Sequence, residues 1–176
     1  GSSTPTSFSK SSNTYTLGIS LTGTPNGLEK LTVMPADANA IYDANDNKAS
    51  LKKDLRNSLN LFDKTPPTIV SLTNNQNEYI DVFFSEPVFA AANAYSLLDV
   101  NDFKLELTGG TATLSASTPK EVIGYADRSE NSKKGYKFRL KIIGLLSGVP
   151  NGEEKISVTP VANSIFDMYG NAASTT

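Results

Sequence analysis

The residues best suited to chemistry are oxygen-bearing side chains in one short loop. Asp43, Asn45, Asp46 and Asn47 lie in "YDANDN", residues 42–47. Alternating carboxylate and amide oxygens in a loop are the ligands that a hard cation such as calcium prefers. The same residue types also build tight turns, in which Asp accepts backbone N–H groups and Asn or Gly takes a positive φ. The loop therefore predicts either a turn, which the sequence favours, or a calcium site.

Two further acids extend the candidate cation site. Asp63 opens "DKTPPT", and Glu86 precedes Pro87 in "FFSEPV". Glu86 either joins Asp63 and a turn aspartate in a metal site between modules, or caps backbone amides where its strand ends. We take Asp43, Asn45, Asp46 and Asp63 as the candidate calcium ligands.

Several kinds of chemistry are excluded or disfavoured by composition. The chain has no Cys and no His, which removes disulfides, thiolate nucleophiles and the usual general base near neutral pH. Four acids are available for a glycosidase-type pair: Asp127, Glu130, Glu153 and Glu154. They stand in loops or next to each other, without the polar constellation that an active site needs. We expect no enzymatic activity.

Charge and hydropathy limit the partners. The net charge is −2 and the isoelectric point is about 5.2. No basic block offers a surface for nucleic acid, and the apolar runs are too short to span a bilayer.

The loop belongs to a long internal repeat. "PNGLEKLTVMPADANAIYDANDNKAS" (25–50) returns as "PNGEEKISVTPVANSIFDMYGNAAS" (150–174). The offset is 150 − 25 = 125 at the first proline and 167 − 43 = 124 at the aspartates. A period of this size is that of a small domain. Gly170 occupies the place of Asp46, which supports the turn interpretation. By the same logic "LKKDLRNSLNLFD" (51–63) should have a counterpart after Thr176.

Alternating apolar residues predict the elements that position these loops. The expected strands are 68–73, 79–88, 102–110, 136–143 and 154–161, with 111–117 as a hairpin partner of 102–110. A short helix or turn is expected at 50–56, followed by a strand at 57–62, and one or two helical turns are expected within 90–100. About seven short strands at this spacing predict an all-β, antiparallel two-sheet sandwich.

The sequence predicts two modules. Residues 1–63 correspond to the C-terminal half of one module, and residues 64–176 to a near-complete one. The consecutive prolines of "DKTPPT" make the junction short and stiff.

Four stretches together resemble bacterial Ig-like repeats: "DKTPPTIVSL", "YIDVFFSEPV", "DFKLELTGGTATL" and "GEEKISVTPVANSIFDMYGNAAS". The resemblance covers 63–176, and 14–63 as a partial unit. Such repeats occur in long secreted and cell-surface proteins, including motility-associated surface proteins and adhesin-like arrays. "DANDN" also resembles the Asp-x-Asn-Asp-Asn linker of cadherins, although the Ala-Pro continuation is absent.

The resemblance implies a non-catalytic, extracellular or cell-surface module that spaces or presents a binding surface. Its expected partners are neighbouring repeat modules, and a cell-surface glycan or protein. The alternatives are a carbohydrate- or ligand-binding accessory module of a secreted enzyme, and an adhesive segment stiffened by calcium. A sugar platform would use exposed aromatic residues drawn from Phe89, Tyr95, Tyr125, Tyr136 and Tyr169.

Overall fold

The computed structural model describes residues 4–54, 56–92, 96–125 and 137–176. The chain forms two compact units, residues 1–64 and 65–176. Their division falls next to the proline pair Pro66–Pro67.

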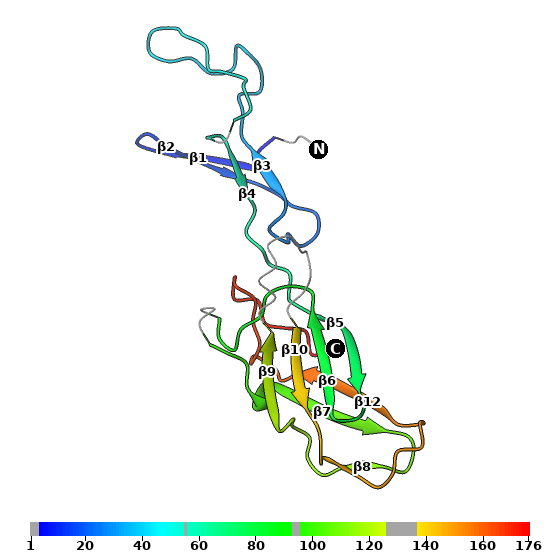
Figure 1. Ribbon diagram of the computed structural model, residues 1–176. Coiled ribbons are helices and arrows are strands. Elements are labelled where there is room, and N and C mark those ends of the chain that lie inside the picture. Colours follow the sequence, from blue (N-terminus) through cyan, green and yellow to red (C-terminus); the bar gives the residue numbers. More distant parts are fainter. Residues whose placement is uncertain (1–3, 55, 93–95, 126–136) are drawn as a thin grey trace. The chain divides into compact units, whose positions relative to one another are not determined.

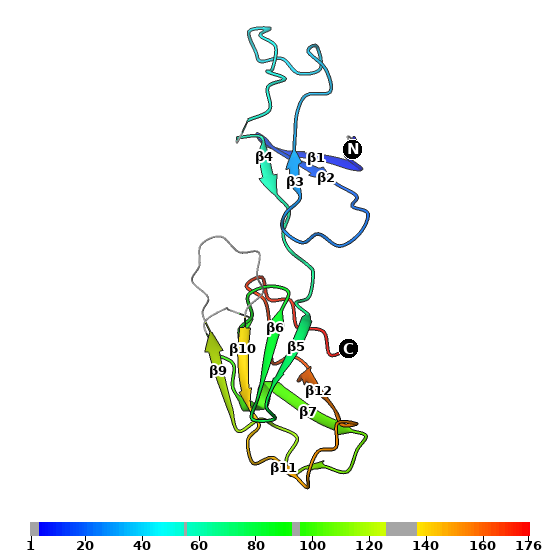
Figure 2. The ribbon, with the colours of Figure 1, turned by 45° about the vertical axis from the view of Figure 1, so that its right-hand side comes forward.

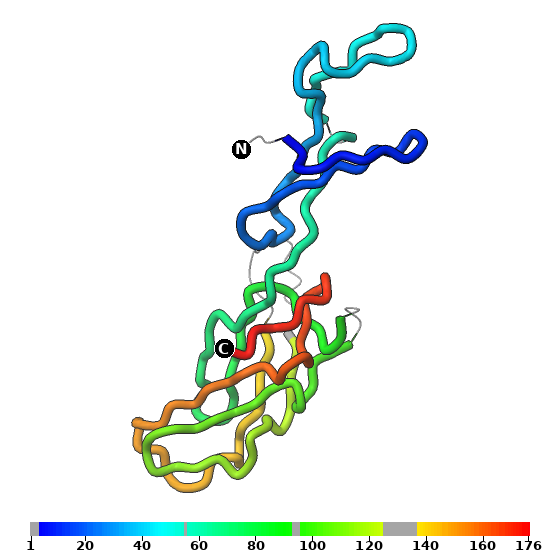
Figure 3. Tube along the Cα trace, turned by 180° about the vertical axis from the view of Figure 1, so that it is seen from behind, coloured from blue at the N-terminus to red at the C-terminus, as the bar shows by residue number. Residues whose placement is uncertain are grey.

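The second unit is built from antiparallel strands (Figures 1 and 2). One sheet has four strands in the order β5-β6-β10-β9, namely β5 (Ile69–Asn75), β6 (Tyr79–Phe84), β10 (Lys137–Lys141) and β9 (Glu121–Tyr125). Two smaller sheets pair β12 (Lys155–Pro160) with β7 (Phe103–Thr108), and β11 (Leu146–Ser147) with β8 (Thr113–Leu114). Figure 3 shows the orange trace of β12 running along the green trace of β7. The architecture is all-β, as expected, and is consistent with a β-sandwich.

The core of the second unit comes from strands with the predicted alternation. In β6, Ile80, Val82 and Phe84 are no more than 1% exposed. The Phe84 ring meets the Phe138 ring of β10 edge-on, with centroids 6.0 Å apart, and lies 6.4 Å from the Phe103 ring of β7. An edge-to-face pair such as Phe84–Phe138 contributes about 0.5–1.5 kcal/mol beyond the area that it buries. The core therefore joins the four-stranded sheet to β7.

One predicted strand pairing is only partly present. Residues 111–117 were expected to return along 102–110 as a hairpin. Instead β8 pairs with β11, and β7 pairs with β12 from Lys155↔Thr108 to Pro160↔Phe103. The Gly109–Gly110 turn has φ values of 74° and 60°, which only glycine adopts readily. β12 occupies the β7 edge formed by residues 104, 106 and 108. On the other edge, Leu105 N–H donates to the Ser117 carbonyl at 2.6 Å, so the end of the 111–117 segment returns to β7.

The first unit has two small sheets. β1 (Ser7–Ser11) pairs with β2 (Thr14–Gly18), and β3 (Lys30–Thr32) pairs with β4 (Ser58–Asn60). Every buried hydrophobic side chain in the described ranges belongs to the second unit. In the first unit Ile41, Leu59 and Phe62 are all more than half exposed.

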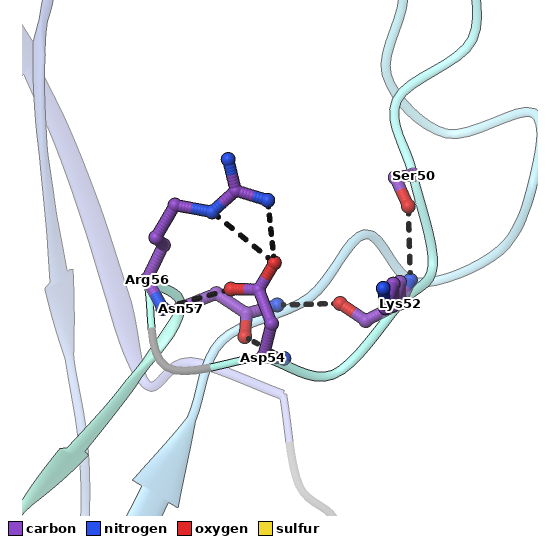
Figure 4. Close-up of polar contacts among 5 residues, drawn as sticks. All are labelled: Ser50, Lys52, Asp54, Arg56 and Asn57. Atoms are coloured by element: carbon purple, nitrogen blue, oxygen red, sulfur yellow. Dashed lines mark hydrogen bonds and ion pairs between the residues drawn. The ribbon is translucent and has the colours of Figure 1, made fainter.

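Polar contacts join residues of the segment that precedes β4 (Figure 4). Arg56 pairs with the Asp54 carboxylate at 2.8 Å, and its backbone N–H donates to the other carboxylate oxygen, also at 2.8 Å. The Asn57 side chain accepts from Asp54 N–H at 3.0 Å and donates to the Lys52 carbonyl at 3.1 Å. The strand expected at 57–62 is thus present at its centre, after a turn.

Helical structure is scarce in the described ranges. Residues 50–54 are not helical, and the expected turns within 90–100 are represented only by a 3-10 helix, η1 (Val100–Asp102), that begins at the end of that range. Residues 55 and 93–95 lie outside the described ranges. No helix in the described part of the chain is both long and apolar enough to cross a membrane.

Candidate functional site

Asp43 organises the first candidate loop as a turn. One of its carboxylate oxygens accepts the N–H groups of Asn45 at 2.8 Å and Asn47 at 2.9 Å, and the other accepts from Asn47 Nδ2 at 2.9 Å. The donation from the Asn47 side chain, followed by those from the two backbone groups, lowers the pKa of Asp43. Asp46 takes the left-handed conformation that the turn requires, with φ of 64°.

The second copy folds in the same way around Asp167. One carboxylate oxygen accepts from the N–H groups of Tyr169 and Asn171, both at 2.8 Å, and the other accepts from Asn171 Nδ2 at 2.7 Å. Gly170 has φ of 85°, in the place of Asp46. In each copy a backbone bond closes the turn, from Ala49 to Ile41 at 2.9 Å and from Ala173 to Ile165 at 2.8 Å. The repeat is therefore present in the structure as well as in the amino-acid sequence.

The Pro-Asn-Gly stretches also match. Asn26 N–H donates to a Glu29 carboxylate oxygen at 3.0 Å, and Asn151 N–H donates to Glu154 at 3.0 Å. Gly27 and Gly152 both have positive φ, 78° and 92°.

Glu154 makes further contacts inside its own unit. It accepts from Thr111 N–H at 2.9 Å and Ala112 N–H at 3.1 Å. Desolvation of Glu154 favours its neutral form, but the N–H groups of Ala112, Thr111 and Gly152 stabilise the carboxylate and lower its pKa to about 2. Glu154 thus fastens the turn before β12 to the loop after β7.

The two turns differ most in burial. Asp167 and Ile165 are fully buried, whereas Ile41 is 54% exposed and Asp43 is exposed. The turn geometry is set by local residues and is therefore the same in both copies. The burial of the turn depends on the residues that pack against it. In the second unit Ile165 is part of the hydrophobic core.

The hydrogen bonds limit what each aspartate can offer a cation. A carboxylate has about four lone-pair sites. Asp43 and Asp167 each use three of them within the turn. Each aspartate retains about one site, whereas calcium takes six to eight oxygen ligands. A calcium ion at either turn would need most of its ligands from elsewhere.

Asp167 has one such additional ligand within its unit. An oxygen of Glu86 and an oxygen of Asp167 lie within 4.8 Å of each other. A backbone bridge between Phe89 and Phe166, with both hydrogen bonds at 2.8 Å, holds the two segments together. Two carboxylates this close repel each other, and a divalent cation would relieve the repulsion.

The other predicted ligands are distributed differently. Asp43, Asn45 and Asp46 are exposed on one loop of the first unit, and Asp63 is buried at the end of that unit. Within the described residues, neither Asp43 nor Asp46 belongs to a group of three carboxylates close enough to share an ion. Sequence reasoning did not place Asp167 in the ligand set, although its repeat match to Asp43 was the available signal.

The aromatic residues considered for a sugar platform are only partly described. Tyr95 and Tyr136 lie outside the described residues, as does the side chain of Tyr125. Tyr169 is 42% exposed on the turn, whereas Phe89 is half-buried in the bridge to Phe166. Of the catalytic candidates, Asp127 and Glu130 also lie outside the described residues.

One buried acid forms ion pairs with basic side chains on the outer face of the four-stranded sheet. Asp81 is 4% exposed and accepts from Arg139 at 2.6 and 2.9 Å and from Lys137 at 2.7 Å. The bond from the Arg139 guanidinium is the largest cause of the lowered pKa of Asp81, with Lys137 adding to it. This arrangement is that of a structural ion cluster joining β6 to β10.

Two shallow depressions occupy matching places in the two units. One is lined by Leu21, Pro25, Glu29 and Leu61, among others, and the other by Leu146, Pro150, Glu154 and Ile156, among others. Three pairs of lining residues are repeat counterparts, because 146 − 21, 150 − 25 and 154 − 29 all equal 125. Both depressions are far smaller than typical small-molecule pockets.

Comparisons with known proteins identify no relative. No protein-family model matches the chain, no curated protein matches it, and no solved structure matches it.

Proposed function

We propose that this chain is a non-catalytic repeat segment of the Ig-like type that spaces modules or presents a surface outside the cell. The observation that carries the proposal is the repeat itself. Two stretches offset by 124–125 residues form the same turns with the same hydrogen bonds, in two separate units. Tandem copies of one small domain are a common way to build an extended protein, because each copy adds length without new chemistry.

The surface features of the second unit support this proposal. The buried acids Asp81 and Asp167 are satisfied by structural partners, and the depressions described above are too shallow to enclose a substrate. The resemblance of residues 63–176 to repeats of secreted and surface proteins gives the proposed location.

Surface labelling tests the proposed location. An antibody raised against residues 65–176 should label intact, unpermeabilised source cells, and brief external protease treatment should remove the label. An antibody to a cytoplasmic protein should label only after permeabilisation. Labelling that requires permeabilisation would contradict the proposal.

Calcium stabilisation is a second candidate property, favoured by the proximity of Glu86 and Asp167. A cation bound there would join the segment after β6 to the last turn of the unit. Calcium should then raise the melting temperature, EDTA should reverse the rise, and Glu86→Gln should abolish it. Asp43→Asn is the matched control, because it alters the equivalent turn in the first unit.

A carbohydrate-binding accessory module remains the alternative prediction. An array of glycans separates it from the leading proposal, because a spacer should bind none of them and an accessory module should bind a related group. Tyr169→Ala then tests the exposed turn as the contact surface.

A further inference from the structure

β12 has one paired edge and one edge without a strand partner among the described residues. Val161 N–H donates to the Asp102 carbonyl at 2.8 Å, next to the register pair Pro160↔Phe103. Residues of an antiparallel strand direct their N–H and C=O groups alternately to one neighbour and to the other. Residues 155, 157, 159 and 161 therefore face β7, and Ile156 and Val158 face the opposite edge.

β3, the repeat counterpart of β12, is paired along that opposite edge. Val33 N–H donates to the Asn57 carbonyl at 2.8 Å, and Leu61 N–H donates to the Glu29 carbonyl at 2.9 Å, with Leu31 opposite Leu59. Residues 29, 31 and 33 thus face β4. Adding the offset of 125 gives residues 154, 156 and 158, which are the positions that face away from β7 in β12. The two units therefore display the two different edges of one repeated strand.

We propose that the open edge of β12 is an acceptor site for an extended strand of the β4 type, supplied by another repeat of this kind. This proposal rests on the geometry of the repeat and does not depend on the proposed extracellular location. The β3–β4 register, shifted by 125, fixes the pairing. Leu59 of the incoming strand would lie opposite Ile156, Leu61 opposite Glu154, and Asn57 opposite Val158. This is strand addition to an exposed sheet edge, with main-chain bonds giving the affinity.

The matching depressions are consistent with this register. In the first unit Leu61 itself lines the depression beside Pro25 and Glu29. In the second unit the depression lies beside the counterparts Pro150 and Glu154, and Ile156 of the open edge also lines it. The register places Leu61 of an incoming strand opposite Glu154, which is beside this depression. In the second unit, Leu61 of the incoming strand would therefore contact the apolar residues of this depression, as Leu61 does in the first unit.

The proline at the end of β12 sets the length of the acceptor. Pro160 lies in the row that faces away from β7, and proline has no N–H to donate. Its counterpart Pro35 lies just beyond the last β3–β4 bond, which is made by Val33. The acceptor edge therefore runs from Glu154 to Val158 and ends at the proline, as the paired edge from Glu29 to Val33 does in the first unit.

The direct test adds a peptide of residues 56–64, RNSLNLFDK, to the isotope-labelled full chain and follows backbone amides by NMR. The amides of Ile156 and Val158 should shift and gain protection from hydrogen exchange. The matched controls are N-methylated peptides. N-methylation of Leu59 removes an N–H that faces the acceptor and should weaken binding at least about tenfold. N-methylation of Ser58 alters an N–H that faces away and should change affinity little.

A tethered version avoids dependence on weak peptide binding. Ser174 matches Ser50, so residues 53–64 appended directly after Thr176 continue the repeat. Tethering raises the effective concentration to the millimolar range. The appended chain should melt several degrees higher and should protect the Ile156 and Val158 amides. Leu59→Pro within the appended copy should abolish both effects.

The remaining outcomes would overturn the proposal. Shifts confined to residues 29–33 would mean that the peptide replaces β4 in the first unit. Protection of Ile156 and Val158 in the chain alone, rising with protein concentration and unchanged by the added peptide, would mean that the edge pairs with β12 of a second copy and not with a β4-type strand. An appended segment that leaves melting and protection unchanged would mean that the edge accepts no such strand.

Discussion

A matched pair of isoleucine truncations tests whether the second copy of the repeat is fixed by burial. Ile41 and Ile165 hold the same place in the same turn, and each accepts the bond that closes it. Ile165 is 0% exposed and Ile41 is 54% exposed. The two variants Ile165→Ala and Ile41→Ala therefore make the same local change in two different environments.

The size of each effect follows from the burial. Ile→Ala removes three carbon atoms, worth about 2.4 kcal/mol at about 0.8 kcal/mol per buried group. At Ile165 the enclosed cavity adds to this, so we expect a loss of about 3–4 kcal/mol in the free energy of unfolding, within the range of about 2–5 kcal/mol for such substitutions. At Ile41 about half of the transfer term is absent and no cavity is enclosed, so the loss should be only about 1 kcal/mol.

Urea unfolding followed by far-ultraviolet circular dichroism measures both variants, and native-state hydrogen exchange at the β6 amides reports on the second unit alone. Ile165→Ala should lower the opening free energy at β6, and Ile41→Ala should leave it unchanged. Equal effects of the two variants, or a loss below about 1 kcal/mol for Ile165→Ala, would refute the reasoning.

Three other predictions address electrostatics, cation binding and the turns. Asp81→Asn should lower the unfolding free energy at pH 7 by about 1–3 kcal/mol, because hydrogen bonds to charged groups are lost, and urea titrations at pH 7 and pH 3 check this. Since the folded pKa of Asp81 is depressed, its stabilisation is present above the unfolded pKa of about 4 and is lost as pH falls through the folded value, so the variant should show less acid sensitivity. Calcium should raise the melting temperature of the wild type but not of Glu86→Gln. A wild-type melting temperature that is the same in calcium and in EDTA would contradict calcium binding at this site. Gly170→Ala should cost about 1–2 kcal/mol because φ is 85° there, whereas Asp46→Gly should be neutral or stabilising; the opposite order in thermal melts would contradict the turn assignment.

The sequence was most informative where local patterns decide the structure. Alternation in "YIDVFF" and "YKFRLKII" predicted β6 and β10, because one face of each strand must be buried. The chemistry of "YDANDN" and "DMYGN" predicted the turns, because Asp, Asn and Gly supply the acceptor and the positive φ within a few residues. The strand within 57–62 was predicted for the same kind of reason.

Features that depend on distant partners could not be predicted in this way. The pairing of β8 with β11 rather than β7 is not encoded in either segment alone, since each is a short strand beside a glycine turn. The same limit applies to burial, because Ile41 and Ile165 have the same local sequence signals and opposite exposure. The proximity of Glu86 to Asp167 depends on the Phe89–Phe166 bridge, which joins segments far apart in the chain.

The most direct test of the central claim is the measurement of through-hydrogen-bond scalar couplings by NMR at the two turns. If residues 25–50 and 150–174 are one structural unit used twice, couplings should appear from Ala49 N to the Ile41 carbonyl and from Ala173 N to the Ile165 carbonyl, with similar magnitude. A coupling at Ala173 without one at Ala49, together with backbone shifts at Asp46 that exclude a positive φ, would show that the resemblance between the two stretches does not extend to their structure.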